Sequence, residues 1–193
     1  MQFLIIERDH LLRRRVEDCI KTVYAEEYGA SINDFPEMLV ALVDDNGKPV
    51  CAAGLRFSED GFFSERYLSQ PIDRILDQAW VSHVERKQIA EVTCLAGAKP
   101  GVSLLLIKHI VDLLRQRSVS WAFFTATERL RAILRRTGVP VLDIGRTSID
   151  CVEDPDQWGG YYDTNPRVVA VHDSMLSITE PPRPIETGVA ISA

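Results

Sequence analysis

The chain has 193 residues, 46% of them hydrophobic, and a formal net charge of −6. This length and composition predict a single globular domain with a sizeable core. The negative charge argues against a general attraction to nucleic acid or anionic lipid. The four cysteines and four histidines are scattered, so we expect neither a metal site nor a disulfide framework.

The chain begins with a short apolar stretch, residues 3–6, which is predicted to form a strand. It stops at Glu7-Arg8, which is too short for a signal peptide. No apolar run reaches the length of a membrane span, and we expect a cytoplasmic protein. Asp9 is predicted to cap a helix that ends before Gly29.

An antiparallel pair of strands is expected next. Residues 39–43 and 50–57 are apolar and are joined across Asp44-Asp45-Asn46-Gly47, a typical hairpin sequence. A loop at residues 58–70 follows, and Pro71 suits the start of a further helix.

The most informative stretch is residues 88–116. Its first part alternates between apolar and polar residues, which predicts a strand ending at the glycines Gly97 and Gly101. Leucine, isoleucine and valine then recur at helical spacing up to Gln116. A strand, a glycine-containing loop and a helix start can bind an anion, because the first helical N–H groups are free and the helix dipole is positive there. Any βα junction can also carry glycines, and this one matches neither a P-loop nor a dinucleotide fingerprint.

The second half predicts three more strands. Residues 121–126 form a nearly all-apolar strand, and Thr127 is expected to cap a helix that ends at Gly138. Residues 139–144 and 167–172 are further strands, separated by an irregular segment. Two arginine groups, at 13–15 and at 129–136, fall on predicted helices. Solvated helix faces are the simpler interpretation of both.

These elements predict an α/β (α+β) protein with a mixed sheet of about seven strands flanked by helices. We expect one domain over residues 1–179. The tail, residues 180–193, is rich in turn-forming residues and is expected to be loosely ordered or to pack as an arm.

The order of elements resembles the GNAT-like acyl-CoA N-acyltransferase fold, in which a strand, a loop and a helix N-terminus hold the cofactor pyrophosphate. Arg56, followed by the aromatic loop Phe62–Leu68, resembles the acyl-homoserine-lactone synthase pattern. Residues 91–95 are similar to the Glu-x-Ser-Arg-Phe strand of that family, although Cys94 stands where its arginine would be.

A closer resemblance covers nearly the whole chain. The segments Phe63–Leu68, Ile89–Val92, Phe124–Thr127 and Trp158–Asp163 together resemble the bacterial thermostable hemolysin family. The position of Cys94 is usually asparagine there. The family name implies membrane damage, whereas the fold implies acyl transfer.

The acyltransferase resemblance implies an acyl donor, either acyl-CoA or an acyl-phosphopantetheine, whose phosphates meet the loop and the helix start after the central strand. The residues expected to bind this cofactor are Leu95, Ala96, Gly97, Lys99, Gly101, Val102 and Ser103. If the donor is an acyl carrier protein, its acidic surface would dock on the basic helix at 129–136.

Glu91 is the candidate catalytic base, because a partly buried carboxylate there would have a raised pKa and could take the amine proton directly or through water. A structural, salt-bridged glutamate is the alternative. Tyr161 or Tyr162 could protonate the leaving thiolate. Cys94 could be a nucleophile close to a helix start, but a small buried cysteine is the favoured interpretation.

The remaining candidates concern the acceptor. Glu65 and Arg66 could bind the amine and carboxylate of a polar acceptor, or form a structural ion pair. Arg56, Phe62, Phe63 and Trp158 are further substrate-binding candidates, with packing as the alternative for the aromatic residues.

We therefore expect an N-acyltransferase that moves a fatty acyl group from coenzyme A or a carrier protein to a small amine or amino-acid-like acceptor. A membrane-active hemolysin and a non-catalytic acyl-ligand-binding module are the alternatives.

Overall fold

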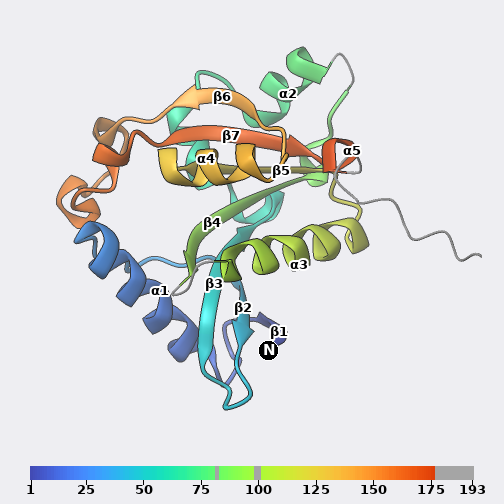
Figure 1. Cartoon of the computed structure of the whole chain (residues 1–193). Helices are drawn as coiled ribbons and strands as arrows, with labels where there is room; N and C mark the ends of the chain where they lie inside the picture. The colour runs from blue at the N-terminus through green and yellow to red at the C-terminus, as the bar shows by residue number, and fades with distance from the viewer. Residues whose placement is uncertain (81–82, 98–100, 177–193) are drawn as a thin grey trace, which may run out of the picture.

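A computed structural model describes residues 1–80, 83–97 and 101–176 (Figure 1). Lys99 and the predicted tail 180–193, with its boundary at 179, lie outside these residues. The strands form one seven-stranded sheet in the order β1-β2-β3-β4-β5-β7-β6. The strands are β1 (Gln2–Ile6), β2 (Met38–Val43), β3 (Pro49–Arg56), β4 (Ile89–Gly97), β5 (Trp121–Ala126), β6 (Leu142–Arg146) and β7 (Arg167–His172).

Helices flank the sheet, so the predicted fold class is confirmed. The α-helices are α1 (Arg13–Tyr28), α2 (Ile72–Trp80), α3 (Val102–Gln116), α4 (Glu128–Arg136) and α5 (Asp173–Leu176). Short 3₁₀ turns occupy the connections, and the one at Phe63–Tyr67, labelled η2, matters for the site.

The sheet is mixed. β1 to β4 pair antiparallel, β4 and β5 are parallel, and β5, β7 and β6 are again antiparallel. The predicted hairpin forms between β2 and β3, where the Asp44 carboxylate accepts hydrogen bonds from the backbone N–H groups of Asn46 and Lys48. The last strand inserts between β5 and β6, a placement that sequence periodicity does not reveal.

Two local predictions at helix starts had different outcomes. Thr127 caps α4 as expected, accepting a hydrogen bond from the Leu130 N–H at 3.2 Å. The prediction that Asp9 caps helix α1 is wrong. Helix α1 begins four residues later, its N-cap position is Leu12, and the N–H of Leu12 donates to the His10 ring at 3.0 Å.

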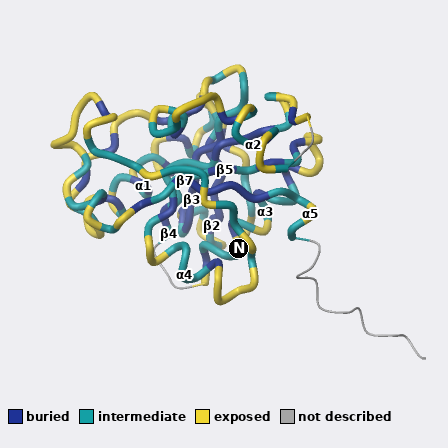
Figure 2. The backbone as a smooth tube through the Cα atoms, turned by 90° about the horizontal axis from the view of Figure 1, so that it is seen from above, coloured by how far each residue is buried: buried dark blue, intermediate teal, exposed yellow. Residues whose placement is uncertain are grey.

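The core has two layers because successive side chains of a strand point to opposite faces. Leu39 and Ala41 of β2 pack under α1, whereas Val40 and Leu42 pack under α3. Helix α2 covers β5 and β7 through Ile72 and Leu76. In Figure 2 the buried, dark blue segments run through the strands, and the exposed segments lie on the outer loops and helices.

Candidate functional site

The central feature is a gap between the parallel strands β4 and β5. They pair only where Ile89, Ala90 and Glu91 face Trp121, Ala122 and Phe123, although both strands continue beyond these pairs. Figure 1 shows the two strands diverging. The sheet therefore opens beyond Glu91.

A bulge in β4 accompanies the divergence. The register between β3 and β4 shifts between Ala52 and Gly54, and Cys94 on the opposite strand has a left-handed φ of 51°. An extra residue bends the bulged strand and increases its twist. A non-glycine residue in this backbone region is uncommon and carries strain of about 1–3 kcal/mol, which proteins tend to retain at functional sites.

A cavity of about 1120 Å³ occupies this gap and extends to both faces of the sheet. That volume exceeds the ~300–1,000 Å³ of typical small-molecule sites. Side chains from the edges of both strands line it: Val92, Thr93, Cys94 and Leu95 of β4, and Ala122, Phe124 and Thr125 of β5.

On the α3 face the cavity is an apolar channel. Its lining includes Leu104, Ile107, Val111 and Leu114 of α3 and Leu130, Ile133 and Leu134 of α4. Leu104 and Leu114 are ten residues apart, which corresponds to roughly 15 Å along a helix at ~1.5 Å per residue. The channel is thus long enough for an extended hydrocarbon chain.

The start of α3 faces the cavity. Within the described residues no side chain caps this helix, which leaves its first N–H groups for a ligand. Gly97, Gly101 and Ser103 line the cavity here. A Cβ at Gly97 would collide with the Ser103 hydroxyl, so a larger residue there would force Ser103 to turn away.

The remaining residues that were predicted to bind the cofactor differ in whether they line the cavity. Leu95 lines the cavity. Ala96 is buried under α1, and Val102 is buried in the core under α3. Neither side chain lines the cavity, although the backbone N–H of Val102 belongs to the open helix start.

Glu91 lies at the closed end of the gap and its side chain has no exposed surface. Oε2 accepts a hydrogen bond from the Phe63 N–H at 2.6 Å. Oε1 accepts from the Ser64 N–H at 2.9 Å and the Ser64 hydroxyl at 2.6 Å. Burial raises the pKa of the Glu91 carboxyl, although these bonds and the charge of Arg56 oppose the shift. Glu91 thus anchors η2, and Oε2 retains lone-pair capacity.

A chain of hydroxyl groups extends from Glu91 across the gap to β5. The Ser64 hydroxyl lies 2.9 Å from the Thr125 hydroxyl, which is on β5 across the gap. Thr125 lines the cavity. Sequence reasoning did not identify Ser64 or Thr125, since neither stands in a pattern that predicts this contact.

On the α1 face the cavity wall is aromatic. All five tyrosines of the chain belong to one cluster with Phe63 and Trp158, although they come from α1, η2 and the 158–162 segment. Gly159 permits this assembly, because a Cβ there would collide with the backbone of Tyr28 and Gly29, and the neighbouring Gly160 N–H donates to the Tyr28 carbonyl at 2.7 Å.

The two tyrosine candidates differ in position. Tyr161 is buried and lines the cavity, and burial raises the pKa of its hydroxyl well above the usual range. Tyr162 is not part of the cavity wall. Its hydroxyl lies 2.6 Å from that of Tyr67, which does line the cavity.

The candidate residues of the loop Phe62–Leu68 also differ in whether they line the cavity. Phe62, Phe63 and Arg66 line the cavity, and the Arg66 guanidinium lies 3.9 Å from the centre of the Phe63 ring. Glu65 is not in the cavity wall. Its two carboxylate oxygens accept hydrogen bonds of 2.6 Å from Arg86. Glu65 therefore forms a structural ion pair, but with Arg86 and not with Arg66.

Cys94 lines the cavity beside the tyrosines, but its thiol is a poor nucleophile. Burial raises the pKa of this thiol to about 11, so little thiolate exists near neutral pH. Among residues 1–80, 83–97 and 101–176, no cluster of histidine, cysteine and acidic side chains is arranged to hold a metal ion.

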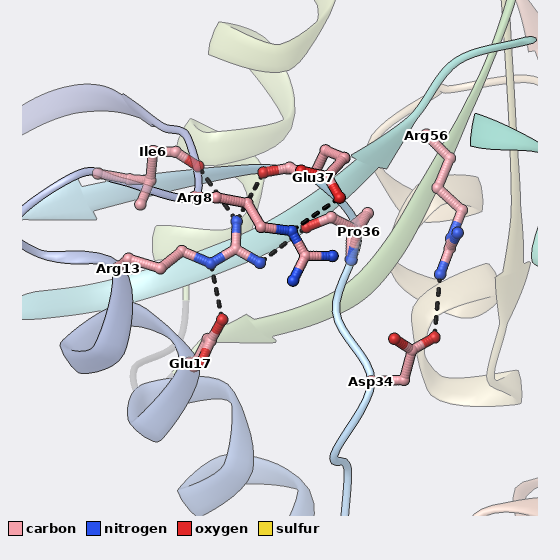
Figure 3. A network of polar contacts seen from close by, with 8 residues as sticks. All are labelled: Ile6, Arg8, Arg13, Glu17, Asp34, Pro36, Glu37 and Arg56. Carbon is pink, nitrogen blue, oxygen red and sulfur yellow. Dashed lines mark hydrogen bonds and ion pairs between the residues drawn. The ribbon is translucent and has the colours of Figure 1, made fainter. Parts of the chain in front are cut away.

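Arg56 lines the cavity on the side of β3, and its guanidinium lies 3.3 Å from the carboxylate of Asp34. Figure 3 shows this pair beside the loop that carries Asp34. The loop is held by Arg13, whose guanidinium donates to the carbonyls of Pro36 and Glu37, each at 2.7 Å.

Arg13 corrects one expectation. The sequence predicts a solvated helix face for the arginine group 13–15, but Arg13 is buried and also donates to Glu17 at 2.6 Å. Arg14 and Arg15 are exposed. Three adjacent arginines give no signal in the sequence that only the first one turns inward.

Comparison with solved structures shows the same fold at low sequence identity. The AHL synthase LasI matches with a TM-score of 0.60 and 11% identity, covering 89% of both chains. FeeM, an N-acyl amino acid synthase from uncultured soil microbes, matches with a TM-score of 0.59 and 12% identity, covering 92% of this chain and 96% of its own. The CoA-dependent acyl-homoserine lactone synthase MesI gives 0.55 and 15%, covering 89% of both chains.

A comparison with curated protein sequences finds no significant match. In the described part of the chain, no helix is both long and apolar enough to span a bilayer. The sequence profile described as "Thermostable hemolysin" matches residues 6–175. The chain therefore belongs to the thermostable hemolysin family.

Proposed function

We propose that the protein transfers a fatty acyl group from a thioester, acyl-CoA or an acylated carrier protein, to the nitrogen of a small amine or amino-acid-like acceptor. The observation that carries this proposal is the cavity through the β4–β5 gap. It connects an apolar channel and an open helix start on one face with an aromatic chamber on the other.

The donor would lie on the α3 face. Its phosphates would meet the free N–H groups at the start of α3, where the helix dipole favours an anion. Its pantetheine arm would enter the gap, and the apolar channel would receive the acyl chain. LasI, FeeM and MesI share this fold. FeeM is named as an N-acyl amino acid synthase, LasI as an AHL synthase and MesI as an acyl-homoserine lactone synthase, which supports acyl transfer as the chemistry.

The choice between coenzyme A and a carrier protein concerns α4. Arg129 and Arg136 line the cavity, while Arg131 and Arg135 lie on the same helix. An acidic carrier protein would fit this basic helix and deliver its phosphopantetheine into the gap.

The acceptor would enter from the aromatic side and attack the thioester carbonyl in the gap. The N–C bond forms, the C–S bond breaks, and the amine loses one proton. Holding the two reactants in line can supply about 7–11 kcal/mol of the barrier. The reaction therefore needs only a positioned pair of substrates and a place for the proton.

Glu91 is the proposed base, and Thr125 and Ser64 would carry the proton to it. Thr125 accepts the proton from the amine while passing its own to Ser64, which passes its own to Glu91. The raised pKa of Glu91 suits this role. The raised pKa of Tyr161 makes it a weak acid, so we assign it a hydrogen bond to the leaving sulfur, with solvent supplying the proton.

Calorimetry with coenzyme A and with acyl-CoA of increasing chain length tests the donor site. We expect binding that strengthens with each added CH₂ by up to about 0.8 kcal/mol until the channel is full. No binding by any of these ligands, and none by an acylated carrier protein, would defeat the proposal.

The family name suggests lysis as a second candidate function. An acylated, surfactant-like product would explain haemolysis without direct membrane attack. Lysis of lipid vesicles by the purified protein, in the absence of any acyl donor, would favour a toxin over an enzyme.

A further inference from the structure

The acceptor side contains two buried polar atoms without partners. Among the side chains that the structure describes, only Arg56 Nε and Thr93 Oγ1 are buried nitrogen or oxygen atoms that lack a hydrogen-bond partner of good geometry, and the Thr93 hydroxyl has only the weakly bonding thiol of Cys94 beside it. Native proteins satisfy the large majority of such atoms, since an unsatisfied one costs about 1–3 kcal/mol. Both residues line the cavity.

The two residues are near neighbours in the sheet. Thr93 of β4 faces Gly54 of β3, and Arg56 is two residues further along β3 on the same face. Gly54 has no side chain, which leaves room for the Thr93 hydroxyl. A Cβ at position 54 would lie 2.6 Å from Thr93 Oγ1.

The visible partner of Arg56 leaves most of its hydrogen-bonding capacity unused. Asp34 accepts one hydrogen bond from an Nη atom at 3.3 Å, and the Asp34 side chain is 86% exposed. An arginine has five N–H donors. Asp34 bonds only to an Nη atom, and the Nε–H is left for a ligand.

We propose that the acceptor is an amino acid whose carboxylate is bound by Arg56 Nε–H and the Thr93 hydroxyl. Its amine is directed to the gap between β4 and β5, and its apolar side chain lies in the aromatic chamber. A guanidinium and a hydroxyl both donate hydrogen bonds, and a carboxylate is the common group that accepts from both at once. This inference rests on the proposed function, since it names the class of acceptor for the same site.

The aromatic wall of the cavity suits an acceptor with an apolar side chain. Tyr24, Tyr28, Trp158 and Tyr161 line the part of the cavity next to α1. The rings offer a large apolar surface to the rest of the acceptor. A protonated polyamine has no acceptor group and would leave Arg56 Nε unpaired.

Matched acceptor pairs test the inference. Release of coenzyme A from lauroyl-CoA is measured with L-leucine against 3-methylbutylamine and with L-phenylalanine against 2-phenylethylamine, which differ only by the carboxylate. We expect kcat/KM to be roughly 10- to 100-fold higher for each amino acid, the value of a hydrogen bond to a charged group. Equal rates for the two members of each pair would overturn the inference, while acyl transfer itself would stand.

Variants locate the carboxylate. Arg56→Gln and Thr93→Val should each remove the preference for the amino acid, whereas their rates with the matched amine should change much less. Arg8→Gln is the control, since Arg8 pairs with Glu37 outside the cavity and should keep the preference. Binding of lauroyl-CoA by each variant verifies the fold.

The outcomes separate this inference from the proposed function. Failure of the wild-type protein to bind any acyl donor would refute the function itself. Donor binding with equal losses for amino acid and amine in Arg56→Gln, or donor binding with no acylation of any amino acid, would refute only the assignment of the acceptor.

Discussion

The two sides of the cavity are built in different ways. The α3 side comes from consecutive elements, β4, α3, β5 and α4, and its apolar lining follows helical and strand periodicity. The acceptor side comes from α1, the 31–37 loop, η2 and the 157–162 segment, which are far apart in the chain. In the proposed function the first side would accept a long acyl chain, whereas the second carries the polar groups that would select an acceptor.

The largest expected effect concerns the acceptor side. Glu91→Gln removes the proposed base and should lower kcat by about 10²- to 10⁴-fold, while acyl-CoA binding on the other side should persist. In the wild-type protein, kcat/KM should fall at low pH through a pKa above the ordinary glutamate value, because burial raises the pKa of Glu91. This acid limb should disappear in the variant.

Glu65→Gln is the matched control for Glu91. The Glu65 carboxylate is paired with Arg86 outside the cavity wall, so kcat should stay close to the wild-type value. A Glu91→Gln variant with normal kcat and an unchanged pH profile would reduce Glu91 to an anchor of η2.

A second substitution separates stability from catalysis on the acceptor side. Arg13→Leu leaves the carbonyls of Pro36 and Glu37 without their buried donor and should lower the free energy of unfolding by about 2–4 kcal/mol. The measurement is chemical denaturation. Arg14→Leu, one residue away and exposed, should change stability by less than about 0.5 kcal/mol. Equal effects would mean that the inward position of Arg13 contributes nothing.

The smallest effect is expected from obstructing the other side. Ile107→Trp places a larger side chain in the apolar channel and should lower kcat/KM for lauroyl-CoA by roughly tenfold, the cost of about one or two lost methylene contacts. Turnover of a short acyl-CoA should change little. Lys108→Trp, on the exposed side of α3, is the control. An equal loss of kcat/KM for acyl-CoA of every chain length would argue against binding of the acyl chain in the apolar channel.

The architecture could be predicted from the sequence because its signals are local. The hairpin at Asp44, the Thr127 cap and the strand–glycine–helix order around Gly97 each depend on neighbouring residues. Arg56, Glu91, Phe63 and Trp158 were identified through the resemblance to known families, and all four line the cavity.

The acceptor side of the cavity could not be predicted from local sequence signals. Tyr24, Asp34, Ser64 and Thr125 contribute to it through contacts between distant segments, for which one sequence has no periodic signal. The separation of Glu65 from Arg66, adjacent in the chain, depends on the direction of a 3₁₀ turn. The inward Arg13 depends on carbonyl groups that only the folded loop brings together.

Mass spectrometry of lipid extracts tests the central claim most directly. Cells expressing the wild-type protein, the Glu91→Gln variant or no added protein would be compared. The account predicts a new N-acylated amine, with an acyl chain of fatty-acid length, in the wild-type extract alone. An extract indistinguishable from the empty control, with the protein folded and acyl donors present, would contradict it.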